Sequence, residues 1–591
     1  MQKSRLFFLK FLKNDRGNGA ILSNLQKQGR GQVWKRSWAQ GWAKRWVQFC
    51  GQTWGITIAT IALVISIPVL VVLSSLWIPQ GALWDHLGST VLSRYFQNSI
   101  LLALGVGVGV SLVGVSTAWI VSVCEFPGRR WLEWALLLPL AAPAYLLAYV
   151  YTDFFEYFGP LQTLLRKIGG WDSAHEYWFP EIRSLPGAIV LFTLVLYPYV
   201  YLITKVSFAE QGRNTIEASR SLGRNPWQSF WLVALPLARP SWMAGLALAL
   251  METLNDFGTV QFFGVDTFTT GIYRTWFGLG EHLGATQLAA VLLLGVLGLL
   301  VTEQWSRRQA QYYQTDGCRQ SFSPYRLQGL RAMGAIVICT LPIALGIVLP
   351  GGLLFAMTLD NWERSVDDRF WSLTTHSFSL AIVTGIIAVI LALILSYGVR
   401  LNPQPLVKSS VRLVGMGYAV PGAVIAVGLL FPVSWIDQGL AILQQGMVHP
   451  IFLGGSAILL VVAYLVRFLA VALGTIESSL TRISPNLDQA ARSLGHTPIQ
   501  TLFQVHLPLL RSGLLTGLML VFVDVMKELP ATIVLRPFNF DTLAIQVYQY
   551  AADERLAEAS APALTILLIG LLPVILLSWQ IIEAQRDPQA R

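Results

Sequence analysis

The chain has 591 residues, of which 54% are hydrophobic and 13% are charged, and its formal net charge is +10. This composition is too apolar for an ordinary soluble globular domain and favours a membrane protein. The excess positive charge lies in the first 45 residues, which carry eleven Lys or Arg against one acid, Asp15. A basic stretch that ends just before an apolar block is explained more simply by contact with anionic lipid headgroups than by nucleic acid. We therefore expect the lipid bilayer as a partner and no nucleic acid.

Twelve apolar blocks, each long enough to cross a bilayer as a helix, follow the basic stretch. Runs of this kind lack the alternation of a barrel, so the sequence predicts an all-α membrane protein with about 12 transmembrane helices. The first six blocks are 54–78, 98–124, 134–152, 186–204, 241–263 and 284–302. The other six are 333–358, 377–399, 414–435, 451–466, 512–535 and 559–580.

Charged residues between the blocks predict the orientation. Basic side chains such as Arg129, Arg224 and Arg482 fall in alternate loops, whereas the other loops are richer in acids such as Asp172 and Asp553. By the positive-inside rule both termini are cytoplasmic. The first block lacks a small-residue cleavage site, so we expect it to stay in the membrane. The four cysteines show no paired spacing, and neither disulfides nor a metal cluster is expected.

An internal repeat defines the architecture. Twelve of 23 positions are identical between segments 217–239 and 489–511, which are 272 residues apart. Nearer the start of each half the offset is 278, which pairs Asn98 with His376 and Pro143 with Pro421. The chain is therefore predicted to be a duplicated six-span unit, in which both copies have the same orientation and the pathway lies between them.

This repeat predicts five segments. They are a basic cytoplasmic N-terminal tail (1–50), a first six-span repeat (51–304), a cytoplasmic linker (305–332), a second six-span repeat (333–582) and a cytoplasmic C-terminal tail (583–591).

The repeated segments lie in cytoplasmic loops between the fourth and fifth spans of each half. Gly223 and Gly495 are suited to a left-handed position after a short helix, and Asn225 and Thr497 can cap the next one. The Leu-Pro pairs that end in Pro236 and Pro508 are predicted to break the helix before the next span. A single such loop could be an ordinary helical hairpin, but two copies at the same topological position favour docking of a two-fold partner.

These loops resemble the coupling loops of binding-protein-dependent ABC importer permeases, a type I architecture with two tandem six-helix repeats. The resemblance implies that a separate ATP-binding subunit dimer docks on the loops and that a periplasmic solute-binding protein delivers the cargo at the bacterial inner membrane. The motif positions are Glu217, Ala218, Gly223 and Pro236 in the first loop and Gln489, Ala490, Ala491, Gly495 and Pro508 in the second. Ser219 and Gln489 depart from the motif, so the second loop lacks the acidic contact.

The chain is expected to be a transport subunit rather than an enzyme. None of its ten lysines follows a glycine, so it has no phosphate-binding G-x-x-x-x-G-K motif. It also has no H-E-x-x-H zinc motif, and we expect no catalytic residues, no resident metal and no cofactor.

In having two fused copies, this chain resembles mainly the permeases of the ferric iron and thiamine importers within that family. The stretches 251–276 and 524–560 are more similar to the iron group. The resemblance therefore implies ferric iron as cargo, with thiamine or another organic cation as the alternative. A twelve-span secondary transporter is the competing class, but its G-x-x-x-D-R-x-G-R-R loop is matched only by Gly128, Arg129 and Arg130.

Acidic residues mark the predicted pathway. Within the block limits, only the fifth and eleventh blocks contain charged residues, and these two blocks are repeat equivalents. The acids are four residues apart in each block, so they would share a helix face near mid-membrane. We expect them to line the pathway for a cation, unless the helices end sooner or Lys527 neutralises its neighbours. The four acids are Glu252, Asp256, Asp524 and Glu528.

A second cluster of oxygen-bearing side chains occurs between Tyr145 and Tyr157. Its members, which also include Tyr149, Tyr151, Asp153 and Glu156, are ligand types suited to a hard cation. An interfacial aromatic belt is the favoured interpretation of this cluster, and no iron ligation is predicted.

Overall fold

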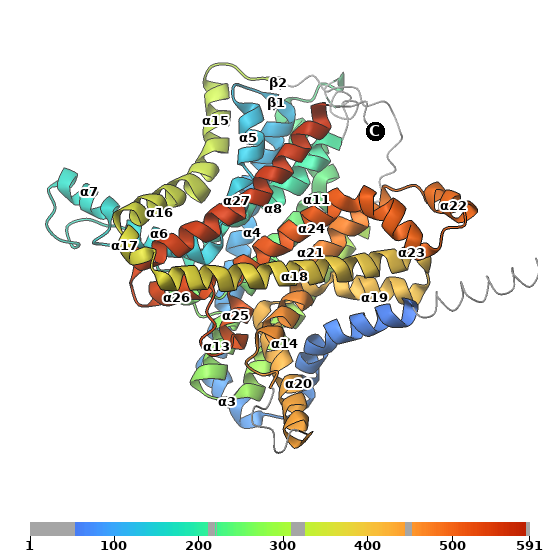
Figure 1. The fold of residues 1–591 in the computed structure, drawn as a ribbon. Helices are drawn as coiled ribbons and strands as arrows, with labels where there is room; N and C mark the ends of the chain where they lie inside the picture. Colours follow the sequence, from blue (N-terminus) through green and yellow to red (C-terminus); the bar gives the residue numbers. More distant parts are fainter. Residues whose placement is uncertain (1–53, 211–218, 220, 309–324, 444–451, 587–591) are drawn as a thin grey trace, which may run out of the picture.

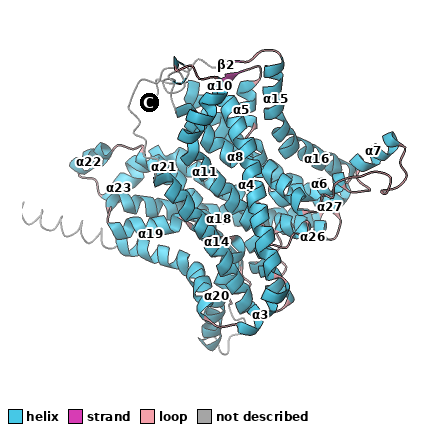
Figure 2. Ribbon diagram, turned by 180° about the vertical axis from the view of Figure 1, so that it is seen from behind, coloured by secondary structure: helices cyan, strands magenta, loops and turns pink. Residues whose placement is uncertain are grey.

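The computed structural model describes residues 54–210, 219, 221–308, 325–443 and 452–586. Within these ranges eleven helices are long and apolar enough to cross a membrane, or twelve if a bent pair counts as one span. The predicted all-α membrane fold is confirmed (Figure 2). The N-terminal tail, Glu217, Ala218, most of the linker and the end of the C-terminal tail lie outside the described residues.

The first half of the structure, residues 54–308, begins with a span at Trp54–Trp77. It continues with α3 (Gly81–Thr90), α4 (Leu92–Val123), α5 (Arg129–Ala135), α6 (Ala144–Phe155), α7 (Pro160–Gly169) and α8 (Leu185–Glu210). After the first repeated loop come α10 (Pro226–Ser229), α11 (Leu235–Asn255), α12 (Gly258–Phe262), α13 (Phe268–Tyr273) and α14 (His282–Arg308).

The second half, residues 325–586, repeats this order. It contains α15 (Leu330–Ile343), α16 (Leu349–Asp360), α17 (Trp362–Ser365), α18 (Asp368–Leu401), α19 (Pro405–Gly415), α20 (Gly422–Leu443) and α21 (Ala457–Thr481). These are followed by α22 (Pro485–Ser493), α23 (Pro498–Thr501), α24 (Leu507–Met526), α25 (Pro530–Leu535), α26 (Leu543–Ala552) and α27 (Leu556–Arg586). Two short strands, β1 (Cys124–Glu125) and β2 (Tyr325–Arg326), pair in parallel and join the halves.

The same three-helix packing occurs twice. In the first half α8 packs against α4 and α11, and in the second half α21 packs against α18 and α24 (Figure 1). Each set brings together three apolar helices that are distant in sequence, as expected from the internal repeat.

The first span of each half packs against the opposite half. In the first span the carbonyl of Pro68 approaches Gly428 of α20 so closely that a Cβ there would lie 2.4 Å from its oxygen. Conversely, a Cβ at Gly346 would lie 2.9 Å from the carbonyl oxygen of Leu194 in α8. Glycine at these two positions therefore lets the first span of each half pack directly against the backbone of the other half.

The third span of the first half is broken, although the sequence predicted one continuous helix over 134–152. Residues Arg129–Ala141 and Ala144–Gly169 form a pair bent by 92°. The break falls at Pro143, and its repeat equivalent Pro421 separates α19 from α20. Proline lacks an N–H and favours an extended residue before it, and Ala142 and Val420 are both extended.

The prediction that the Leu-Pro pairs break the helix is wrong. The helices run without interruption through Trp227–Asn255 and Pro498–Met526. A π-helical turn precedes each pair, at Phe230–Ala234 and at Leu502–His506. The wider π-helical turn accommodates the rings of Pro236 and Pro508 inside these continuous helices.

Candidate functional site

The fifth and eleventh spans end at equivalent places, and both end sooner than the sequence predicted. α11 ends at Asn255 and α24 at Met526, whereas the apolar blocks continued to 263 and 535. After each break a short helix begins, α12 in the first half and α25 in the second. The spans therefore end early, as the alternative expected, but the Glu528 side chain beyond the second end is 1% exposed and not open to water as that alternative implied.

Two of the predicted acids cap the short helices. The Asp256 carboxylate accepts a hydrogen bond from the Thr259 N–H at 2.8 Å, and Glu528 accepts from the N–H groups of Ala531 at 2.8 Å and Thr532 at 3.0 Å. Unpaired N–H groups at a helix start favour an acceptor with negative charge. The prediction that Asp256 and Glu528 share a continuous helix face with Glu252 and Asp524 is wrong for this reason.

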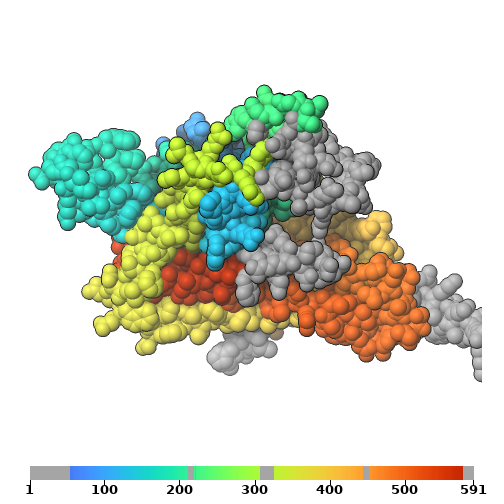
Figure 3. Space-filling model, turned by 90° about the horizontal axis from the view of Figure 1, so that it is seen from above, coloured from blue at the N-terminus to red at the C-terminus, as the bar shows by residue number. Residues whose placement is uncertain are grey.

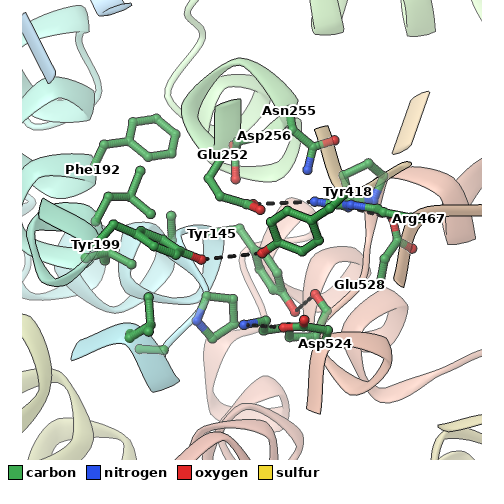
Figure 4. A pocket seen from close by; sticks show the side chains of 18 of the residues that line it. Tyr145, Phe192, Tyr199, Glu252, Asn255, Asp256, Tyr418, Arg467, Asp524 and Glu528 are labelled. Carbon is green, nitrogen blue, oxygen red and sulfur yellow. Dashed lines mark hydrogen bonds and ion pairs between the residues drawn. The ribbon is translucent and has the colours of Figure 1, made fainter. Parts of the chain in front are cut away.

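The two breaks meet between the halves and line a cavity of about 100 Å³ (Figure 4). All four predicted acids line it, two from each half, together with Asn255 and Lys527. Because these acids come from both halves, the cavity lies where the repeat predicts a pathway. The Lys527 ammonium lies 3.0 Å from the Asp524 carboxylate, so Lys527 neutralises Asp524 as the alternative interpretation expected, whereas Glu528 pairs with Arg467 instead.

Arg467 of α21 is the residue that the sequence analysis missed. Its side chain is 8% exposed, and its guanidinium lies 3.4 Å from Glu252 and 3.6 Å from Glu528, whose side chain is 1% exposed. The predicted block 451–466 stopped before this arginine because a charged residue ends an apolar run, whereas α21 continues to Thr481. The apolar residues after Arg467 were the signal that could have placed it inside a span. In the repeat alignment, its counterpart 272 residues earlier is Val195.

Aromatic hydroxyl groups complete the lining. The hydroxyl oxygens of Tyr199, from α8, and Tyr418, from the second half, lie 3.5 Å apart. Tyr145 donates a 3.5 Å hydrogen bond to the Lys527 carbonyl across the interface. These contacts connect the halves around the cavity.

The tyrosine cluster between 145 and 157 is dispersed. Tyr145, Tyr149 and Tyr151 are buried, so the interpretation as an interfacial belt is wrong for these three. The Arg166 guanidinium instead lies over the Tyr157 ring, 4.0 Å from the centre of that ring. Arg166 belongs to α7, which projects from the bundle (Figure 3). Only Tyr145 of this cluster lines the cavity.

The repeated loops have the predicted local structure where they are described. Gly223 and Gly495 have left-handed φ angles of 80° and 86°. Asn225 accepts a 2.8 Å hydrogen bond from the Gln228 N–H, and Thr497 forms a capping box with Gln500. In the second loop Gln489 and Ala490 are exposed and Ala491 is buried. Pro236 and Pro508 follow the loops in sequence and lie in the first turns of α11 and α24.

A charged contact attaches α22 of the second loop to the membrane helices. The Arg400 Nε, from α18, lies 2.8 Å from Asp488, and the His506 Nε2, just before α24, lies 2.8 Å from the same carboxylate. Arg400 also donates to the carbonyls of Leu480 at 2.8 Å and Ile483 at 3.0 Å. One arginine therefore fixes the helix of the loop to the end of α21. In the first half, the hydroxyl oxygens of Ser219 and Ser229 lie 2.9 Å apart and form a hydrogen bond.

Comparison with known proteins identifies the family. The family described as "Binding-protein-dependent transport system inner membrane component" matches the chain twice, at residues 110–308 and 386–581. The chain is 25% identical to an Fe(3+)-transport system permease protein of Haemophilus influenzae, over 82% of this chain and 90% of that protein. It is 21% identical to a ferric transport system permease protein of Actinobacillus pleuropneumoniae, over 85% of this chain and 73% of that protein. A sulfate transport system permease protein of Escherichia coli is 32% identical over 28% of this chain and 53% of its own length. The chain belongs to the inner-membrane permeases of binding-protein-dependent ABC transport systems, in a form that carries two copies of the permease domain in tandem.

Proposed function

We propose that this chain is the membrane subunit of an ATP-driven importer that takes ferric iron from a periplasmic binding protein and releases it in the cytoplasm. The observation that carries this proposal is the cavity between the halves, which is lined by Glu252, Asp256, Asp524 and Glu528. Carboxylates buried among membrane-spanning helices are costly unless they face a partner or a polar pathway. A lining of this kind lowers the barrier for a cation.

The character of the lining supports a cation over an anion. Sulfate permeases are among the relatives, but four carboxylates against Arg467 and Lys527 would repel a dianion. Two relatives with high coverage are named as ferric or Fe(3+) permeases, which supports iron as the cation. Thiamine or another organic cation remains the alternative, since it satisfies the same charge argument.

The two loops are proposed as docking sites for an ATP-binding subunit dimer. Leu222 and Leu494 are repeat equivalents, and they are 80% and 79% exposed. Each immediately precedes the left-handed glycine of its loop, so the turn presents an apolar side chain twice around the pseudo-axis. Exposed apolar residues at matched positions support a two-fold protein partner. Glu217 and Ala218 of the motif belong to the same proposed surface.

The proposed orientation places both loops and both termini in the cytoplasm. The basic residues of 1–50 and of the linker support this orientation through the positive-inside rule. The five segments defined by the repeat fit it as well, because each six-span unit returns the chain to the same side.

Reconstitution tests the proposal. The chain is co-expressed with its ATP-binding subunit and solute-binding protein, placed in liposomes, and supplied with radioactive iron, thiamine or sulfate. We expect uptake of iron that requires ATP and the binding protein. Uptake of thiamine without iron would support the organic-cation alternative, and uptake that needs no ATP would contradict the importer assignment.

A further inference from the structure

Arg467 occupies the position that a cationic cargo would need. Its guanidinium lies between Glu252 of the first half and Glu528 of the second, inside the cavity between the halves (Figure 4). Of the residues that line this cavity, four are carboxylates and two are cations, so Arg467 supplies half of the positive charge. Lys527 already pairs with Asp524 at 3.0 Å, which leaves Arg467 as the cation that contacts Glu252 and Glu528.

The contacts of Arg467 are long for a structural ion pair. Its carboxylate distances are 3.4 and 3.6 Å, whereas charge-assisted hydrogen bonds are about 2.7–2.9 Å long. Its buried Nε has no hydrogen-bond partner among the described residues. The Nη2 of Arg467 donates a 3.4 Å hydrogen bond to Glu252, whereas an unsatisfied donor such as the buried Nε is unfavourable.

Arg400 of the same chain shows what a fixed arginine looks like. Its three nitrogens make contacts of 2.8, 2.8 and 3.0 Å with Asp488 and two backbone carbonyls. Arg467 is charged and buried, as a residue that joins the two halves would be, but it lacks the short contacts that Arg400 makes. Its carboxylate contacts are longer than the contacts that fix Arg400, and its guanidinium also lies 5.2 Å from the centre of the Phe468 ring.

Only one half provides this arginine. The repeat equivalent of Arg467 is Val195, which is buried in α8, so the lining of the cavity contains a single guanidinium. Its contact with Glu252 also joins α21 to α11, and this contact must lengthen if the two helices separate. Separation of the halves would therefore also remove the positive charge of Arg467 from Glu252 in the cavity.

We infer that Arg467 is a tethered cation that holds the carboxylate site between the halves until the halves separate, and that cationic cargo then takes its place. This inference rests on the proposal that the cavity lies on the transport pathway. Arg467 neutralises Glu252 and Glu528 while the halves are in contact, and so prevents small cations from using the acids as a leak. It also stabilises the contacting state against separation without cargo.

The test uses the complete complex in liposomes without cargo and without binding protein. Basal ATP hydrolysis reports separation of the halves, and quenching of trapped calcein by external Co²⁺ reports cation leak. For Arg467→Gln we expect both rates to rise about tenfold, which corresponds to a loss of about 1.4 kcal/mol in the contact between the halves. Arg467→Lys keeps the charge, so we expect both of its rates to stay within about twofold of those of the unmodified chain, which is clearly less than the tenfold rise.

Two further variants make the result interpretable. Arg482→Gln removes an exposed arginine at the end of the same helix and should change neither rate. If Arg467→Gln fails to fold, the double variant Glu252→Gln, Arg467→Gln removes both charges of the inter-half pair, and basal ATP hydrolysis should still rise. Wild-type rates in Arg467→Gln, or in the double variant if it is the one that folds, would overturn the inference. An Arg467→Lys variant that leaks as much as Arg467→Gln would also overturn it, because packing rather than charge would then be the cause.

Neither rate depends on iron. If the unmodified complex transports a different cargo, the proposed substrate fails while the Arg467 test still applies. If iron transport is confirmed and Arg467→Gln matches the unmodified chain, only the tethered-cation inference fails.

Discussion

Asn255, the last residue of α11, accepts a 2.6 Å hydrogen bond from the backbone N–H of Gly422, the first residue of α20. Both residues are buried, and the bond joins the two halves beside the carboxylate cavity. An N–H in the first turn of a helix has no partner within that helix, so Asn255 provides one from the other half. The end of one span thus fixes the start of the opposite broken span.

Removing this acceptor should destabilise the contact between the halves. Asn255→Leu leaves the Gly422 N–H buried without a partner, at a cost of about 1–3 kcal/mol. We expect a lower thermal unfolding temperature of the purified protein in detergent. Asn255→Asp keeps an oxygen acceptor and should lose less stability. Equal unfolding temperatures for Asn255→Leu and the unmodified chain would contradict the role of this bond.

The loop glycines should be required for coupling to ATP hydrolysis. A β-branched residue at a left-handed φ costs roughly 1 kcal/mol or more, so the double variant Gly223→Val, Gly495→Val should distort both turns. We expect loss of transport with normal membrane insertion, measured by uptake and by ATP hydrolysis in liposomes. Gly170→Val is the matched control, because Gly170 also has a left-handed φ, of 66°, but follows α7. Full transport by the double variant would remove the coupling assignment.

The cavity acids should set the amount of cargo moved per ATP. In Glu252→Gln, Asp524→Asn, one carboxylate is lost from each half, and the barrier for a cation rises. We expect uptake to fall while hydrolysis of ATP stimulated by the binding protein persists, so the ratio of the two decreases. Glu477→Gln changes an exposed acid of α21 and should leave the ratio intact. A wild-type ratio in the double variant would exclude the acidic lining as a pathway but would leave the fold unaffected.

Asp488 should hold the second loop in position. Asp488→Asn removes the charge that Arg400 and His506 contact, and a hydrogen bond to a charged group contributes about 1.5–3 kcal/mol. We expect weaker binding of the ATP-binding subunit, measured as the concentration of that subunit needed for half-maximal hydrolysis. Glu477→Gln again serves as the control. Unchanged binding would show that the contact is not needed to position α22.

The sequence predicted the features that depend on local chemistry or on the repeat. The apolar blocks predicted nearly all the spans, because a bilayer requires long apolar helices. The offset of 272 residues predicted two equivalent halves, and Gly223 and Gly495 have the left-handed backbone that their position after a helix favours. The four acids of the fifth and eleventh blocks do meet around one cavity.

Only the tertiary structure decided where helices end and which charges meet. A proline in an apolar run can break a helix, as Pro143 does, or be accommodated by a π-helical turn, as Pro236 is, and the surrounding packing selects between these outcomes. Asp256 lies beyond the end of α11 because its carboxylate caps α12. Arg467 is compatible with a membrane helix because carboxylates from both halves approach it, and one of them is 215 residues away in sequence. The free energy of a buried charge depends on such distant partners, and a pattern along one chain does not contain them.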